Sequence, residues 1–63
     1  KYRYRLSTAR AVRGALRAGE RVVARIDGLY FERVLEVRER KGILQVRVRY
    51  DKPWVVAKGV WVC

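Results

Sequence analysis

The chain has 63 residues, with sixteen lysines and arginines against six acidic residues, which leaves a formal net charge of +10. This length fits one domain, near the lower limit at which a hydrophobic core holds a fold without disulfides or metals. Cys63 is the one cysteine and histidine is absent, so the sequence excludes an internal disulfide, and it predicts no metal site and no cofactor. No run of about 18 apolar residues occurs, so we expect no membrane-spanning helix.

Residues 1–6 alternate basic and apolar side chains. This pattern predicts either an edge strand with Tyr2, Tyr4 and Leu6 on its inner face or a disordered arm that orders on a partner. Tyrosines between arginines also suit single-stranded nucleic acid, because the rings can stack on bases while arginine holds phosphate.

A short helix is predicted over residues 9–18, with Ser7 or Thr8 as its N-cap and Gly19 as its end. Apolar side chains four residues apart give this helix one narrow stripe, which could lie across the end of a barrel. We therefore expect residues 1–18 to form a basic N-terminal arm or short helix.

Residues 19–50 alternate apolar and polar side chains between two turn signals, which is typical of a three-stranded β-meander. Asp27-Gly28 provides the first turn, and residues 39–42 provide the second. Arg33 falls on the apolar side of the second strand, so either its stem is buried or a bulge reverses the alternation there. The inner faces of the three strands are expected to hold Val22, Ala24 and Ile26, then Leu29, Phe31, Leu35 and Val37, then Leu44, Val46, Val48 and Tyr50.

Two further short strands are predicted after a turn at residues 51–53. They cover residues 54–57 and 60–62, which are rich in β-branched and aromatic side chains. Closing these strands with the meander would bury one face and remove exposed strand edges. The expected fold is mainly β, a five-stranded small barrel over residues 19–63 preceded by the arm or helix of residues 1–18.

The distribution of charge indicates a polyanionic partner. Residues 1–19 hold six basic residues and one end of the chain therefore carries six of the ten net charges. Arginine, with its planar guanidinium, is well suited to phosphate, although the arginines of the sheet could instead pair with Glu32 and Glu36 across strands. The residues expected to bind nucleic acid are Arg3, Arg5, Arg10, Arg13, Arg17, Arg47 and Arg49, with Tyr2, Tyr4 or Trp54 stacking on bases.

Three short segments within residues 19–57 resemble the strands of a known family of small domains. Gly19-Glu20-Arg21-Val22-Val23-Ala24-Arg25 is similar to the opening strand of many Tudor domains. Asp27-Gly28-Leu29-Tyr30-Phe31 is similar to the loop and aromatic pair that open their second strand. Val46-Arg47-Val48-Arg49-Tyr50-Asp51 matches the third strand, where an aromatic residue precedes an acid. The resemblance covers somewhat over half of the chain and implies a five-stranded SH3-like (Tudor-like) barrel that acts as a non-catalytic reader.

The resemblance also implies an aromatic cage for methylated lysine or arginine, because ring faces attract a cation. The positions that match the cage are Tyr30 or Phe31, Tyr50, Trp54 and the neighbouring acid Asp51. Ile26 stands where methyl-lysine readers often have another aromatic residue. The alternative is that Phe31 and Tyr50 fill the barrel.

Catalysis is not expected, because the chain has no histidine, no partner base for Cys63 and no glycine-rich phosphate loop. The first hypothesis is a module that binds the phosphate backbone of DNA or RNA. The alternatives are a reader of methylated peptides, as in chromatin, and a protein–protein assembly module that exposes a strand edge or residues 60–63. We expect no membrane partner and an intracellular location, with the nucleus as one option.

Overall fold

The computed structural model describes residues 2–63, which form a mainly β fold with one short helix, as the sequence predicted. In chain order the elements are β1 (Tyr4–Leu6), α1 (Ala9–Arg17), β2 (Val22–Asp27), β3 (Tyr30–Arg33), β4 (Glu36–Arg40), β5 (Ile43–Arg47), β6 (Val55–Val56) and β7 (Gly59–Val62). In this part of the chain no helix is long and apolar enough to span a membrane.

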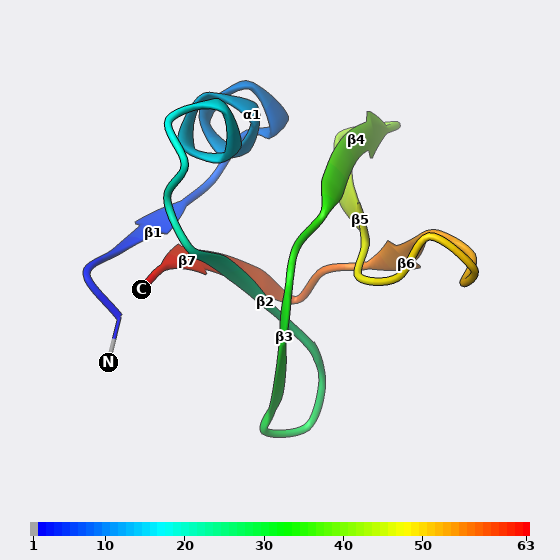
Figure 1. Cartoon of the computed structure of the whole chain (residues 1–63). Coiled ribbons are helices and arrows are strands. Elements are labelled where there is room, and N and C mark those ends of the chain that lie inside the picture. Colours follow the sequence, from blue (N-terminus) through cyan, green and yellow to red (C-terminus); the bar gives the residue numbers. More distant parts are fainter. Residues whose placement is uncertain (1) are drawn as a thin grey trace.

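The strands form two antiparallel sheets, with the orders β1-β7-β2-β3 and β4-β5-β6. Strand β7, the last in the chain, pairs with β1 on one side and β2 on the other (Figure 1). The N-terminal segment is therefore an edge strand over Tyr4–Leu6. Of its three expected inner residues only Leu6 is buried, whereas Tyr2 and Tyr4 are exposed. The predicted strands near the C-terminus are also present, as β6 and β7.

The segment predicted as one continuous second strand is divided between the two sheets. Val34 and Val37 are both buried in the core, although strict alternation would place residues three apart on opposite faces. The Val34 amide donates to the Val22 carbonyl at 2.9 Å in the first sheet, and the next amide, of Leu35, donates to the Arg47 carbonyl at 2.8 Å in the second. The alternation thus reverses at a crossing after Arg33. The expected bulge is not at Arg33, because the register shift of the β2–β3 ladder lies between Arg25 and Asp27.

Several predicted inner-face positions are wrong: Leu29, Phe31, Leu35 and Tyr50 all lie outside the core cluster. Phe31 lies opposite Arg25 on the face of the first sheet that points away from the core. Leu29 is exposed in the turn between β2 and β3, and Tyr50 is 69% exposed because β5 ends before it, at Arg47. The remaining inner positions of the first and third predicted strands do face the core.

The two sheets do not close into the predicted five-stranded barrel within residues 2–63. One cause is the crossing after β3, which ends its ladder with β2 at Arg33. Another is that the chain leaves strand conformation between β5 and β6. The observed architecture is a small fold of two open sheets (Figure 1).

Helix α1 begins and ends close to the predicted residues. The Thr8 hydroxyl accepts a hydrogen bond from the Ala11 amide at 3.0 Å, so Thr8 rather than Ser7 is the N-cap. At the other end Gly19 has a φ of 77°, and its amide donates to the Leu16 carbonyl at 3.1 Å. Glycine tolerates this left-handed conformation, which satisfies a carbonyl of the last helical turn.

The hydrophobic core lies between α1 and the inner faces of both sheets. Its largest fully buried side chains are Val12, Val22, Val34, Val46, Val60 and Val62. Leu6, Ala9 and Ala15 from the N-terminal segment are buried in the same cluster. The segment predicted as an arm or short helix therefore contributes directly to the core of the sheets.

Candidate nucleic-acid interface

The face of the first sheet that points away from the core carries one continuous row across its four strands. In this row Arg5 lies opposite Trp61, Trp61 opposite Val23, and Val23 opposite Arg33. Residues directly opposite one another in antiparallel strands project to the same side of the sheet. Their neighbours in sequence, such as Val22 and Val60, are buried in the core, so the row occupies the outer face.

A second row lies beside the first and contains Gly59, Arg25 and Phe31. We call the set formed by both rows the outer face. In the register of β2 and β3, Glu32 lies opposite Ala24, which belongs to the core, so this acid projects to the other side. Neither row contains a carboxylate, and the charged side chains in them are all arginine.

Three aromatic rings gather on the outer face, and we call them the aromatic cluster: Tyr2, Phe31 and Trp61. The centroid of the Tyr2 ring lies 5.0 Å from that of Phe31 and 5.5 Å from that of Trp61. The Phe31 and Trp61 rings meet edge to face, with centroids 5.5 Å apart. These distances are those of favourable aromatic pairs.

The first sheet leaves room for one ring of the aromatic cluster at Gly59. The Trp61 indole lies directly over Gly59, where an added Cβ would come within 2.8 Å of Cζ3 of the ring. Val23 is only 8% exposed although it faces away from the core, and it lies directly opposite Trp61. The guanidinium carbon of Arg5 lies 5.4 Å from the Trp61 ring centroid, a cation–π distance.

A second basic and aromatic group is formed on the other sheet by Trp54 with Arg38 and Arg47. The guanidinium carbons lie 4.5 Å and 4.7 Å from the Trp54 ring centroid. Desolvation lowers the pKa of the Arg38 guanidinium, and the positive charges of Arg40 and Arg47 lower that pKa further. Trp54 is thus already in contact with two cations.

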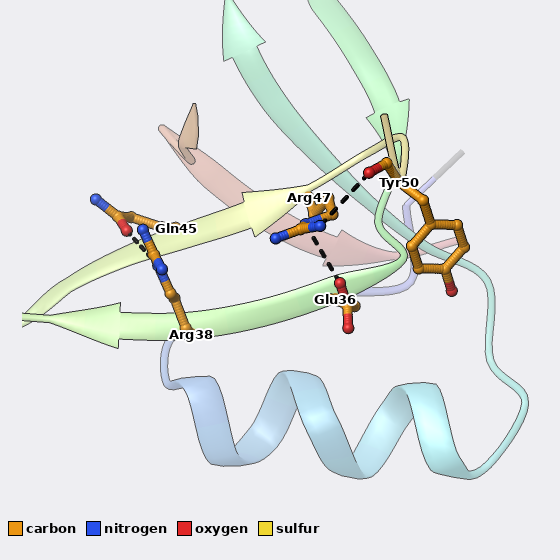
Figure 2. Close-up of polar contacts among 5 residues, drawn as sticks. All are labelled: Glu36, Arg38, Gln45, Arg47 and Tyr50. Carbon is orange, nitrogen blue, oxygen red and sulfur yellow. Dashed lines mark hydrogen bonds and ion pairs between the residues drawn. The ribbon is translucent and has the colours of Figure 1, made fainter. Parts of the chain in front are cut away.

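Polar contacts hold these two arginines in place, as Figure 2 shows for the β4–β5 hairpin. Nε of Arg38 donates to Oε1 of Gln45 at 2.6 Å. Nε of Arg47 lies 3.3 Å from Oε1 of Glu36, and Nη1 of Arg47 donates to the Tyr50 carbonyl at 3.5 Å. The Arg47–Glu36 pair lacks hydrogen-bond geometry, so Nε of Arg47 is buried without a hydrogen-bond partner.

The aromatic residues predicted to form a cage are not gathered around one point. Phe31 belongs to the aromatic cluster, and Trp54 is faced by two guanidiniums. Tyr30 is 79% exposed, and Tyr50 and Asp51 are also exposed. Within residues 2–63 the ring–ring contacts join only members of the aromatic cluster. A methylammonium group needs several ring faces around it, so the aromatic cage stays a prediction.

The seven arginines predicted to bind nucleic acid are spread over several surfaces. Arg5 belongs to the outer face, whereas Arg47 contacts Trp54 on the other sheet. Arg3 pairs with Glu20 at 2.8 Å, a hydrogen bond that raises the pKa of the Arg3 guanidinium. The remaining four are exposed, on helix α1 or after β5: Arg10, Arg13, Arg17 and Arg49.

A cavity of about 420 Å³ lies between the two sheets, near the end of β3. Ile26, Val48 and Val55 supply its apolar wall, and Glu32 and Arg49 supply charges of opposite sign. None of its lining residues is aromatic, so it does not replace the predicted cage.

The residues expected to bind nucleic acid did not include Trp61, Arg25 or Arg33. A signal for Trp61 was present, because Val60 and Val62 alternate with it and both enter the core. Alternation alone then directs the indole outward. Arg25 lies opposite Phe31, and Arg33 lies opposite Val23. Both positions depend on the register of β2 and β3, which shifts between Arg25 and Asp27.

The described residues contain few candidates for metal binding or thiol chemistry. Among residues 2–63, no three side chains of the types His, Cys, Asp or Glu lie together as metal ligands would. Cys63 is a free, half-buried thiol. The features that stand out are therefore the arginine surfaces and the aromatic cluster.

Comparison with protein-family models, with curated proteins and with solved structures found no match to this chain.

Proposed function

We propose that this chain is a non-catalytic module that binds nucleic acid through its phosphate backbone, using arginine side chains on the outer face. The observation that carries the proposal is the row from Arg5 to Arg33, in which cations flank an aromatic centre and no carboxylate intervenes. Arginine donates in a planar fork that matches phosphate oxygens, and it is less strongly hydrated than lysine.

The overall charge supports the same proposal. The formal net charge is +10, and the ion pairs found within residues 2–63 occupy only Arg3 and Arg47. A polyanion bound to such a surface releases its condensed counterions, which favours binding. A lysine-rich peptide would instead approach a surface of like charge, which slows association. The charge therefore favours nucleic acid over a methylated histone-type peptide.

A salt titration tests this proposal directly. Binding of a fluorescent single-stranded oligonucleotide and of a duplex is measured by anisotropy as the salt concentration rises. The logarithm of the association constant should fall linearly with the logarithm of salt, by about 0.7 per phosphate contact for a single strand and about 0.9 for duplex DNA. Binding that stays flat as salt rises would contradict a phosphate-backbone mechanism.

Two double variants locate the contacts. In Arg5→Gln/Arg33→Gln the slope for a single strand should become shallower by about 1.4, since two phosphate contacts are removed. The control Lys41→Gln/Lys52→Gln removes the same charge from exposed turns outside the first sheet, so its slope should change less. Equal effects of the two variants would show that net charge alone, and not the outer face, is responsible.

A trimethyl-lysine peptide serves as the parallel probe for the alternative reader function. We expect it to bind no better than its unmethylated form, because Trp54 is already faced by Arg38 and Arg47. The resemblance to Tudor domains and to SH3-like barrels stays a prediction, and the proposed binding mode does not depend on it.

A further inference from the structure

We infer that the aromatic cluster is a stacking surface for the bases of single-stranded nucleic acid, with Arg5, Arg25 and Arg33 holding the adjacent phosphates. This inference rests on the proposed function and deepens it, because it specifies the form of nucleic acid and the way its bases are held. The supporting observation is that the cluster lies in the middle of the outer face, where the charged side chains are all arginine.

The cluster is not required to fill the core. The core lies on the opposite side of the sheet and is closed by valines such as Val22 and Val60. Tyr2 is 44% exposed, so one large ring remains open to solvent at the top of the cluster. Phe31 and Trp61 are half-buried beneath and beside it. Such a surface offers ring faces to an incoming planar group.

The arginines are placed where a bound strand would need positive charge. Arg5 on β1 and Arg33 on β3 lie at opposite ends of the row, separated by three strand spacings, or roughly 14 Å. Arg25 on β2 belongs to the second row, and its Nη1 donates a hydrogen bond to the Gly28 carbonyl at 3.3 Å. Positive charge on both sides of stacked rings is the arrangement that single-strand binders use.

The form of the nucleic acid follows from the chemistry of stacking. In a duplex the base faces are covered by neighbouring pairs, so side chains that stack on bases find none available. An unpaired strand exposes its base faces, and stacking tolerates any base because each has a π face. Charge complementarity selects a polyanion over an apolar protein partner for this face.

The test compares two single strands that have the same backbone charge. One is an oligonucleotide with all its bases, and the other has abasic sites at its central positions. If the cluster stacks on bases, the complete strand should bind at least roughly fivefold more tightly, at any one salt concentration. DNA and RNA versions of both strands show which sugar is preferred.

Variants of Tyr2 connect this preference to the cluster. Tyr2→Ala should reduce the preference for the complete strand to near onefold with an unchanged salt slope, and Tyr2→Phe should restore it. The matched control is Tyr30→Ala, because Tyr30 is exposed on the same hairpin as Phe31 and lies outside the cluster. The position of Tyr2 before β1 keeps the core intact in these variants, as circular dichroism would verify.

Fluorescence gives an independent reading. In Trp54→Phe the remaining tryptophan is Trp61, so its emission reports on the cluster alone. The complete strand should quench this emission, and the abasic strand should quench it much less.

The outcomes separate the inference from the proposed function. If both strands bind equally, with steep salt dependence and no effect of Tyr2→Ala, the backbone proposal stands and the stacking surface is overturned. If neither strand binds, both fail. If the chain is dimeric and Tyr2→Ala makes it monomeric without changing the preference, the cluster is a self-association surface and the inference is likewise overturned.

Discussion

At the scale of single residues, Gly59 determines where the Trp61 indole can lie. Any side chain at this position would collide with the ring, because even a Cβ would lie 2.8 Å from Cζ3. We predict that Gly59→Ala displaces the indole and lowers the free energy of unfolding by about 1–3 kcal/mol, the usual cost of overpacking. Chemical denaturation followed by Trp61 fluorescence in the Trp54→Phe background measures both effects.

Gly14 is the matched control, since it lies within α1 and an added Cβ would meet no atom within 4 Å. Gly14→Ala should raise the free energy of unfolding by about 0.5–1 kcal/mol, because alanine loses less conformational entropy in a helix. A neutral Gly59→Ala beside a stabilising Gly14→Ala would mean that the indole is not held against the sheet.

At the scale of elements, the start of α1 depends on one side chain. The Thr8 hydroxyl accepts from the Ala11 amide, whereas the neighbouring Ser7 makes no such cap. Thr8→Ala should therefore lower the free energy of unfolding by about 1 kcal/mol. Ser7→Ala is the control and should be close to neutral. Equal losses in the two variants, measured by urea denaturation, would refute the assignment of the cap.

The sheets show how an element can take an unexpected course. Alternation predicted a single strand through residues 29–37, but the chain crosses between sheets at Val34 and Leu35. The crossing allows Val34 and Val37 both to enter the core, and it leaves Phe31 and Arg33 on the outer face. Each fully buried valine side chain stabilises the fold by about 1.5–3 kcal/mol, so the burial of both favours the crossing over a continuous β-ladder.

At the scale of the whole molecule, the N-terminal segment and the sheets share one core. Leu6 and Val12 are buried with Val60 and Val62, and β1 pairs directly with β7. We predict that a chain lacking residues 1–18 does not fold, because a domain of this size has little stability to spare. Circular dichroism and amide proton dispersion in NMR spectra would show the loss.

A chain lacking only residues 1–3 is the control, because it retains β1 and the whole core. It should unfold in one cooperative transition, with the aromatic cluster incomplete. A folded sheet in the chain without residues 1–18 would instead establish that residues 19–63 are an independent domain.

Local sequence patterns predict the helix, the hairpin turn and the inward or outward direction of strand residues, because these depend on neighbouring residues. Helix α1 follows from a capping residue, an apolar stripe and a glycine stop, and the β4–β5 hairpin follows from Lys41-Gly42, both with positive φ. Alternation also placed Val46 inward and Gln45 outward, as observed. These are local preferences of backbone and side chain, so one segment is enough to read them.

The pairing of the elements, and with it the candidate site, depends on contacts between distant parts of the chain. The aromatic cluster joins Tyr2, Phe31 and Trp61, which are far apart in the sequence and meet because β7 inserts between β1 and β2. Two of the expected cage residues, Phe31 and Trp54, belong to separate groups of side chains. The physical reason is that strand pairing and register are set by the burial of one shared core, to which every segment contributes and which no segment specifies alone.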